Sequence, residues 1–170
     1  NTTALNLNTD WVPYLASFVD EEVMSTGLWD GIFYDEVQDT IDWISPLDVN
    51  VDGENDSASE ANLLWEERYI ELFSETRDLL GDDAVIITNG SSNSSFAPHV
   101  NGRMFETFPS SSDSLTDWKN STQDYLDFEE EVAFDPITVI NVNTENTGTS
   151  SDYQKVRFGI TTTLLGNGYF

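Results

Sequence analysis

The sequence predicts an α/β fold with a parallel sheet, because strand-like and helix-like segments alternate along its 170 residues. Short apolar runs at 31–37, 84–88 and 137–142 are typical of strands that are buried on both faces. In the segments between and before these runs, apolar residues recur at helical spacing. Buried strands joined by helices occur in closed barrels and in doubly wound sheets, and the alternation alone is compatible with both.

Each predicted element follows from its own local pattern. Gly27 and Gly81 end helical patterns, as glycine commonly does at a helix C-terminus. The segment 151–165 is ambiguous, because its apolar residues have helical spacing whereas its three threonines favour a strand, and we predict a helix. The predicted elements are, in order, a helix over 11–23, a strand over 31–37, a helix over 59–80, strands over 84–88 and 103–108, a helix over 114–132, a strand over 137–142, a helix over 151–165 and the start of a strand at 168–170.

The charge of the chain is extreme. It has 32 Asp and Glu residues against 6 Lys and Arg residues, a formal net charge of −26. Such a chain repels itself at low ionic strength, and the repulsion becomes tolerable when salt near 1 M shortens the screening length to about 3 Å. An acidic disordered tail is the alternative, but 12% aromatic and 38% hydrophobic residues are typical of a folded core. The composition therefore predicts a protein from a salt-loving organism.

The same composition excludes several partners. Nucleic acids and anionic membranes would be repelled by this charge, and no run of about 18 apolar residues is present that could insert into a membrane. The absence of cysteine excludes disulfides and cysteine nucleophiles. Asn-x-Ser/Thr sequences, for example at Asn93 and Asn120, favour an exported protein, so we expect it outside the cell or at the cell surface.

Polar side chains stand at the ends of several predicted strands. Barrel enzymes build their active sites from the carboxyl ends of many strands, whereas a doubly wound sheet concentrates its site at one switch point. The sequence contains no Gly-x-Gly-x-x-Gly motif and no phosphate loop, which further favours the barrel. The polar residues at strand ends are Asp35, Glu36, Asn89, Glu106, Asn141 and Asn143.

Asp35 and Glu106 are the candidate catalytic residues. Side chains alternate between the two faces of a strand, so Asp35 is on the other face of the strand from Ile32 and Tyr34. These two bulky side chains suit the outside of a barrel, which helices cover. We therefore expect Asp35 to face the lumen, with Glu106 at the end of the strand over 103–108. Two carboxylates at one barrel mouth can cleave a glycosidic bond, one as nucleophile or base and the other as general acid. The alternative is that both are solvated acids in an acid-rich chain.

Other side chains are candidates for contact with a sugar. Trp43 lies in the loop after the first predicted strand, where an exposed ring could stack on a sugar. The only histidine is His99, and a lone histidine is more often structural than catalytic. The predicted substrate contacts are Asn89, Trp43, Asn141, Asn143 and His99.

The loop over 48–56 matches the start of a calcium-binding loop. Oxygen-bearing side chains recur at alternate positions, and Gly53 supplies the turn. The twelfth position is Ser59 instead of a bidentate Glu, so the match is partial, and an acidic turn of a halophilic protein is the alternative. The predicted ligands of a structural Ca²⁺ are Asp48, Asn50, Asp52, Asp56 and the backbone oxygen of Glu54.

Several sequence segments resemble those of a known family. They are the residues 27–36 (GLWDGIFYDE), 48–53 (DVNVDG), 61–65 (ANLLW), 99–106 (HVNGRMFE) and 157–170 (RFGITTTLLGNGYF). Together they resemble the hypothetical glycosyl hydrolase family numbered fifteen, which is related to the polygalactosaminidases and to α-galactosidase-like barrels.

The resemblance implies a single TIM-barrel domain in which Asp35 ends strand four and Glu106 ends strand six. On that count the chain is the C-terminal portion of a (β/α)8 barrel, about strands four to eight, truncated at both ends, since a complete barrel needs about 250 residues. The related barrels carry the nucleophile and the acid/base at these strand ends. Where the family phrase often has Asn, this chain has Glu36, so either Asp35 or Glu36 could act.

These observations predict a glycoside hydrolase that acts on a polysaccharide with retention of configuration. Asp35 would attack the anomeric carbon, and Glu106 would protonate the leaving oxygen and then activate water. The alternative is a carbohydrate-binding barrel without catalytic activity. A nucleotide-binding α/β domain would need glycine loops and basic strand ends, which the sequence lacks.

Overall fold

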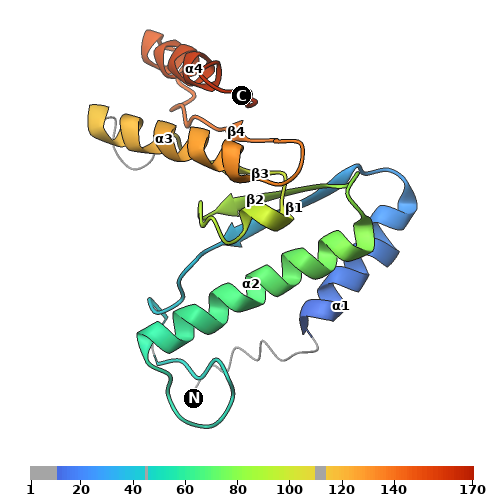
Figure 1. The fold of residues 1–170 in the computed structure, drawn as a ribbon. Helices are drawn as coiled ribbons and strands as arrows, with labels where there is room; N and C mark the ends of the chain where they lie inside the picture. Colours follow the sequence, from blue (N-terminus) through green and yellow to red (C-terminus); the bar gives the residue numbers. More distant parts are fainter. Residues whose placement is uncertain (1–10, 45, 110–113) are drawn as a thin grey trace. The chain divides into compact units, whose positions relative to one another are not determined.

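The computed structural model describes residues 11–44, 46–109 and 114–170 (Figure 1). The chain divides into two compact units. The first consists of the residues up to Ile32 together with Val37–Val85, and the second consists of Phe33–Glu36 together with Ile86–Phe170.

The first unit is built around a long helix, α2, which packs against α1. Ser57 caps α2, because its Oγ accepts a hydrogen bond from the backbone N–H of Glu60 at 3.3 Å. Gly81 ends the helix with a φ of 78°, as predicted. The helical elements of this unit are α1 (Trp11–Phe18), the π-helical turn η1 (Val19–Val23), the 3₁₀ turn η2 (Met24–Thr26) and α2 (Ala58–Leu80).

A four-stranded sheet runs in the order β1-β2-β3-β4, so neighbouring strands follow the order of the chain. The pairing is parallel, with Ile87 of β2 opposite Gly102 of β3 and Phe105 of β3 opposite Ile140 of β4. Near the C-terminus, Tyr169 forms a parallel bridge with Val139. The strands are β1 (Gly31–Val37), β2 (Val85–Gly90), β3 (Gly102–Phe105) and β4 (Val139–Ile140).

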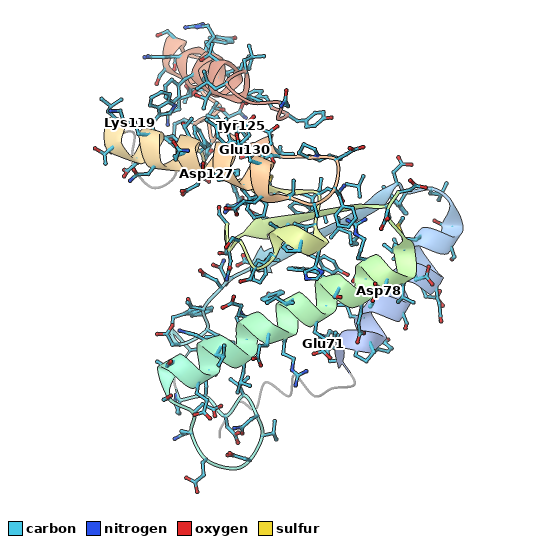
Figure 2. The ribbon with its side chains drawn as sticks, viewed as in Figure 1. Glu71, Asp78, Lys119, Tyr125, Asp127 and Glu130 are labelled. Carbon is cyan, nitrogen blue, oxygen red and sulfur yellow. The ribbon has the colours of Figure 1, made fainter. Side chains whose placement is uncertain are left out.

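Two helices cover this sheet in the second unit, α3 (Leu115–Glu131) and α4 (Ser150–Thr163). Tyr125 of α3 is fully buried and packs with Phe105, Phe108 and Ile140 in one hydrophobic cluster (Figure 2). Burial of such large side chains against β3 and β4 is the main favourable contribution to packing in this unit.

The α/β class and the parallel sheet are confirmed. The ambiguous segment is a helix, α4, as predicted, but Tyr153 and Ile160, whose spacing predicted it, are exposed. The buried positions of α4 are Asp152, Gly159, Thr162 and Thr163. Between β2 and β3 the connection contains only a 3₁₀ turn, η3 (Ala97–His99). Closure of the sheet into a barrel, and the single domain that a barrel implies, stay predictions. Within the described residues, no helix combines the length and the apolar character needed to cross a membrane.

Candidate functional site

Three polar residues lie at the carboxyl ends of three neighbouring strands in the second unit. Asp35 is near the end of β1, Asn89 is near the end of β2, and Glu106 directly follows β3. The strands are adjacent in the sheet order, so these residues meet at one edge. The predicted grouping of polar strand ends is therefore present for this set.

Asn89 connects the two carboxylates. Its Nδ2 donates to Asp35 Oδ1 at 3.0 Å and to Glu106 Oε2 at 3.1 Å. A carboxyl oxygen without a proton only accepts hydrogen bonds, so the amide turns its NH₂ group toward both of these oxygens. Because both oxygens bond one nitrogen, they are at most about 6 Å apart.

In each carboxylate, one oxygen accepts a hydrogen bond and the other does not, within the described residues. Asp35 Oδ1 also accepts from the backbone N–H of Glu36 at 2.9 Å. Among the described residues, no hydrogen bond reaches Asp35 Oδ2 or Glu106 Oε1. Both side chains are exposed to solvent, whereas Asn89 is half-buried. One oxygen of each acid is therefore accessible to a ligand from solvent.

The residue after each of these three has a positive φ. Glu36, Gly90 and Thr107, which follow the three site residues, have φ values of 58°, 142° and 53°. Only glycine adopts positive φ without steric cost, and a β-branched threonine there is unusual. Such backbone conformations persist where the surrounding structure imposes them, and they occur often at functional sites.

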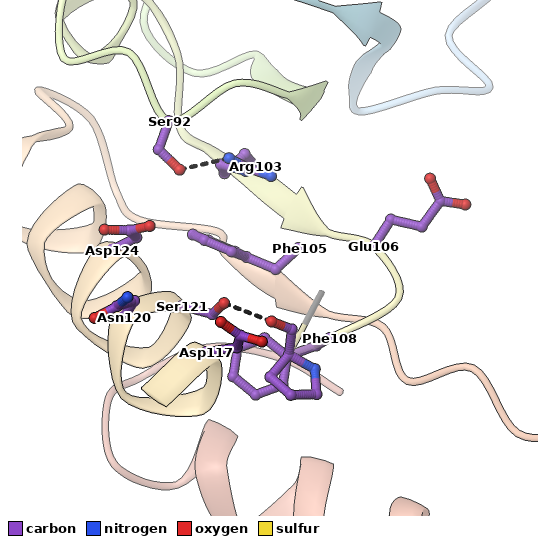
Figure 3. A pocket seen from close by; sticks show the side chains of 10 residues that line it. Ser92, Arg103, Phe105, Glu106, Phe108, Asp117, Asn120, Ser121 and Asp124 are labelled. Atoms are coloured by element: carbon purple, nitrogen blue, oxygen red, sulfur yellow. Dashed lines mark hydrogen bonds between the residues drawn. The ribbon is translucent and has the colours of Figure 1, made fainter. Parts of the chain in front are cut away.

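A cavity of about 340 Å³ lies between β3 and α3 (Figure 3). Arg103 and Phe105 line it from β3, and Asp117 and Asp124 line it from α3. Glu106 borders the cavity, but its carboxylate extends away from α3 in Figure 3 and bonds Asn89. The cavity and the carboxylate pair therefore belong to different faces of β3, as strand alternation requires.

Arg103 is a residue that the sequence predictions missed. Burial lowers the pKa of its guanidinium to about 10, although the charge of Asp124 opposes this change. The guanidinium carbon lies 4.1 Å from the centroid of the Phe105 ring, and Nη1 donates to Ser92 Oγ. The sequence feature that could have identified Arg103 is the scarcity of basic residues, since the chain has only 6 Lys and Arg.

The other predicted sugar contacts are distributed more widely. Asn141 follows β4, and its backbone N–H donates to the carbonyl of Phe105 at 3.0 Å while its side chain is exposed. Asn143 is exposed as well, and His99 ends η3 in a half-buried position. Trp43 belongs to the first unit and its side chain is 72% exposed. Contact of these four residues with a substrate stays a prediction.

The predicted calcium loop is held together by its own polar groups. Both carboxylate oxygens of Asp48 accept backbone N–H groups at 3.0 Å, from Asp52 and Gly53. The side chain of Asn50 donates to Asp56 at 3.2 Å, and the backbone N–H of Glu54 donates to Asp52 at 2.8 Å. In the described part of the chain, no group of three or more His, Cys, Asp or Glu side chains is arranged to hold a metal ion. The calcium site stays a prediction.

Comparison with known proteins identifies the family of the chain. No curated protein and no solved structure matches it. The model of hypothetical glycosyl hydrolase family 15 matches residues 3–170, which includes every residue of the site. The chain therefore belongs to hypothetical glycosyl hydrolase family 15.

Proposed function

We propose that the protein is a glycoside hydrolase that cleaves an O-glycosidic bond in a polysaccharide with retention of configuration. The observation that carries this proposal is the pair of carboxylates, Asp35 and Glu106, which one amide group holds at the carboxyl edge of a parallel sheet. Membership of a glycosyl hydrolase family supports the reaction class.

The spacing of the acids supports the stereochemistry. Retaining enzymes hold their two carboxyl groups about 5–5.5 Å apart, whereas inverting enzymes hold them about 6.5–9.5 Å apart to admit a water molecule. The hydrogen bonds to Asn89 limit the distance between Asp35 Oδ1 and Glu106 Oε2 to about 6 Å. This upper limit applies to the two oxygens that Asn89 binds, and it lies below the separation typical of inverting enzymes.

The reaction would proceed in two displacements. Asp35 Oδ2 attacks the anomeric carbon, and the bond to the leaving oxygen breaks as that oxygen takes a proton from Glu106. Glu106, now ionised, removes a proton from a water molecule. The resulting hydroxide attacks the anomeric carbon and releases the Asp35 carboxylate, so both acids return to their starting states.

The hydrogen bond from Asn89 to Asp35 supports Asp35, and not Glu36, as the nucleophile. Asn89 donates to Asp35 and to Glu106, whereas the backbone N–H of Glu36 donates to Asp35. In this arrangement Glu36 supports the nucleophile through its main chain.

The test is a comparison of three isosteric variants on a panel of polysaccharides in high salt. We expect Asp35→Asn and Glu106→Gln each to lower kcat by about 10³-fold or more, because each loses a group that takes part in bond breaking. Glu36→Gln keeps the backbone N–H and serves as the matched control, with kcat near that of the wild type. NMR of the first product should show the anomeric configuration of the substrate.

The outcome can also contradict the proposal. If Asp35→Asn kept near-wild-type activity while Glu36→Gln lost it, the wrong acid of the pair would have been chosen. A protein that binds polysaccharides tightly and cleaves none of them would be the non-catalytic carbohydrate-binding barrel instead.

A further inference from the structure

We propose that Asn89 is a positioning residue that sets the spacing of the two carboxylates and selects which oxygen of each one reacts. This inference rests on the proposed hydrolase function and adds a role for a residue outside the acid pair. It gives Asn89 a role that differs from the substrate contact that the sequence predicts.

The side-chain amide of Asn89 has a limited number of hydrogen-bond donors. A primary amide has two N–H bonds, and the structure directs Nδ2 of Asn89 to Asp35 at 3.0 Å and to Glu106 at 3.1 Å. Both donors are thereby used within the protein. Only the carbonyl oxygen of Asn89 remains for a sugar hydroxyl group.

The position of Asn89 in the sheet places it between the two acids. The strand β2 lies between β1 and β3, so a residue at its carboxyl end has a neighbour on each side. Asn89 pairs with Met104, and Glu106 lies two residues further along, directly after the end of β3. A side chain of this length at this position can reach both acids.

The hydrogen bonds of Asn89 also distinguish the two oxygen atoms of each carboxyl group. Asp35 Oδ1 accepts hydrogen bonds from Asn89 and from the backbone N–H of Glu36, which leaves Oδ2 as the more nucleophilic atom. Asn89 likewise occupies Glu106 Oε2, so the proton that is transferred resides on Oε1.

The bridge can be tested without a substrate, by NMR of the side-chain NH₂ group of Asn89 in the ¹⁵N-labelled chain. Asp35→Ala should move one of the two amide protons upfield, and Glu106→Ala should move the other, because each variant removes one acceptor. The exposed side chain of Asn120 on α3 provides a reference signal that stays in place. If both variants moved the same proton, or neither moved any, the bridge would be overturned.

Kinetics then test the positioning role. Asn89→Asp keeps the shape of the side chain and removes both donors, and we expect kcat to fall about 10²-fold, the loss typical of reacting groups displaced by about 1 Å, with KM little changed. Asn120→Asp makes the same chemical change at an exposed position and should keep the wild-type kcat. A raised KM with unchanged kcat would assign Asn89 to substrate binding and reject the positioning role.

The two proposals fail in different ways. A wild-type protein that cleaves no glycan would reject the hydrolase function, while the amide protons would still decide whether the bridge exists. If Asn89→Asp did not fold, Asn89→Ala and Asn89→Ser would provide the same kinetic comparison. Full activity in a folded Asn89→Ala variant would overturn the positioning role.

Discussion

Thr107 has a backbone conformation that a threonine seldom adopts, with a φ of 53°, immediately after Glu106. The left-handed region costs a residue with a Cβ atom about 1–2 kcal/mol. Glu36 has the same kind of conformation immediately after Asp35. At the scale of single residues, each acid is therefore followed by a residue with a left-handed backbone conformation, in addition to its hydrogen bond with the bridging amide.

We expect Thr107→Gly to raise the free energy of unfolding by up to about 1 kcal/mol, because glycine removes the strain but adds backbone entropy to the unfolded chain. Urea denaturation would measure the change. Thr116→Gly, at an exposed position in α3, should instead lower the stability by a few tenths of a kcal/mol, roughly the difference in helix propensity. A clear loss of stability in Thr107→Gly would show that the left-handed conformation is not strained.

Among the elements, α3 and α4 are joined by specific polar contacts as well as by apolar packing. Tyr125 of α3 donates a hydrogen bond from Oη to the carbonyl of Thr163 at 3.0 Å and accepts one from the N–H of Gly168 at 2.8 Å. Trp118 of α3 donates from Nε1 to Thr162 at 3.0 Å. Burial raises the pKa of the Tyr125 phenol, so the group stays protonated and keeps its donor at neutral pH.

Tyr125→Phe should lower the free energy of unfolding by about 1–3 kcal/mol, because it removes the partner of a buried carbonyl and of a backbone N–H while keeping the ring. The measurement is chemical denaturation followed by tryptophan fluorescence, since Trp118 lies in the same unit. Tyr153→Phe, at a side chain that is 59% exposed on α4, is the matched control and should change little. Equal effects of the two substitutions would contradict the structural role of the Tyr125 hydroxyl.

For the whole molecule, the dominant property is the charge of −26. Repulsion among exposed acids is screened over about 10 Å at 0.1 M salt and over about 3 Å at 1 M. If the protein comes from a salt-loving organism, as we propose, its folded state should be more stable at high salt.

We expect the melting temperature to rise steeply between about 0.1 M and 2 M KCl, as screening relieves the repulsion. A variant in which five exposed acids become amides should be less dependent on salt; suitable positions are Glu21, Glu22, Asp83, Glu130 and Glu131. A melting temperature that stayed flat over this range would count against the halophilic interpretation.

Local features could be predicted because their causes are local. The strand at 31–37 was predicted from its apolar run, and Gly81 ends a helix because it reaches a positive φ at little cost. The helix over 150–163 was predicted too, but it buries Gly159, Thr162 and Thr163 instead of the apolar residues whose spacing predicted it. The strand over 103–108 was predicted too long, since β3 ends at Phe105 before Thr107 turns the chain. Apolar spacing carries no information about that turn.

By itself, the sequence determined the α/β class, the family resemblance, the charge, and the identity of Asp35 and Glu106 as acids at strand ends. Only the tertiary structure decided that Asn89 joins them, because a hydrogen bond between residues 54 positions apart depends on the order and register of the strands. The burial of Arg103 was decided in the same way, by the packing of α3 on β3. Composition and spacing describe neighbours along the chain, whereas a site is made by neighbours in space.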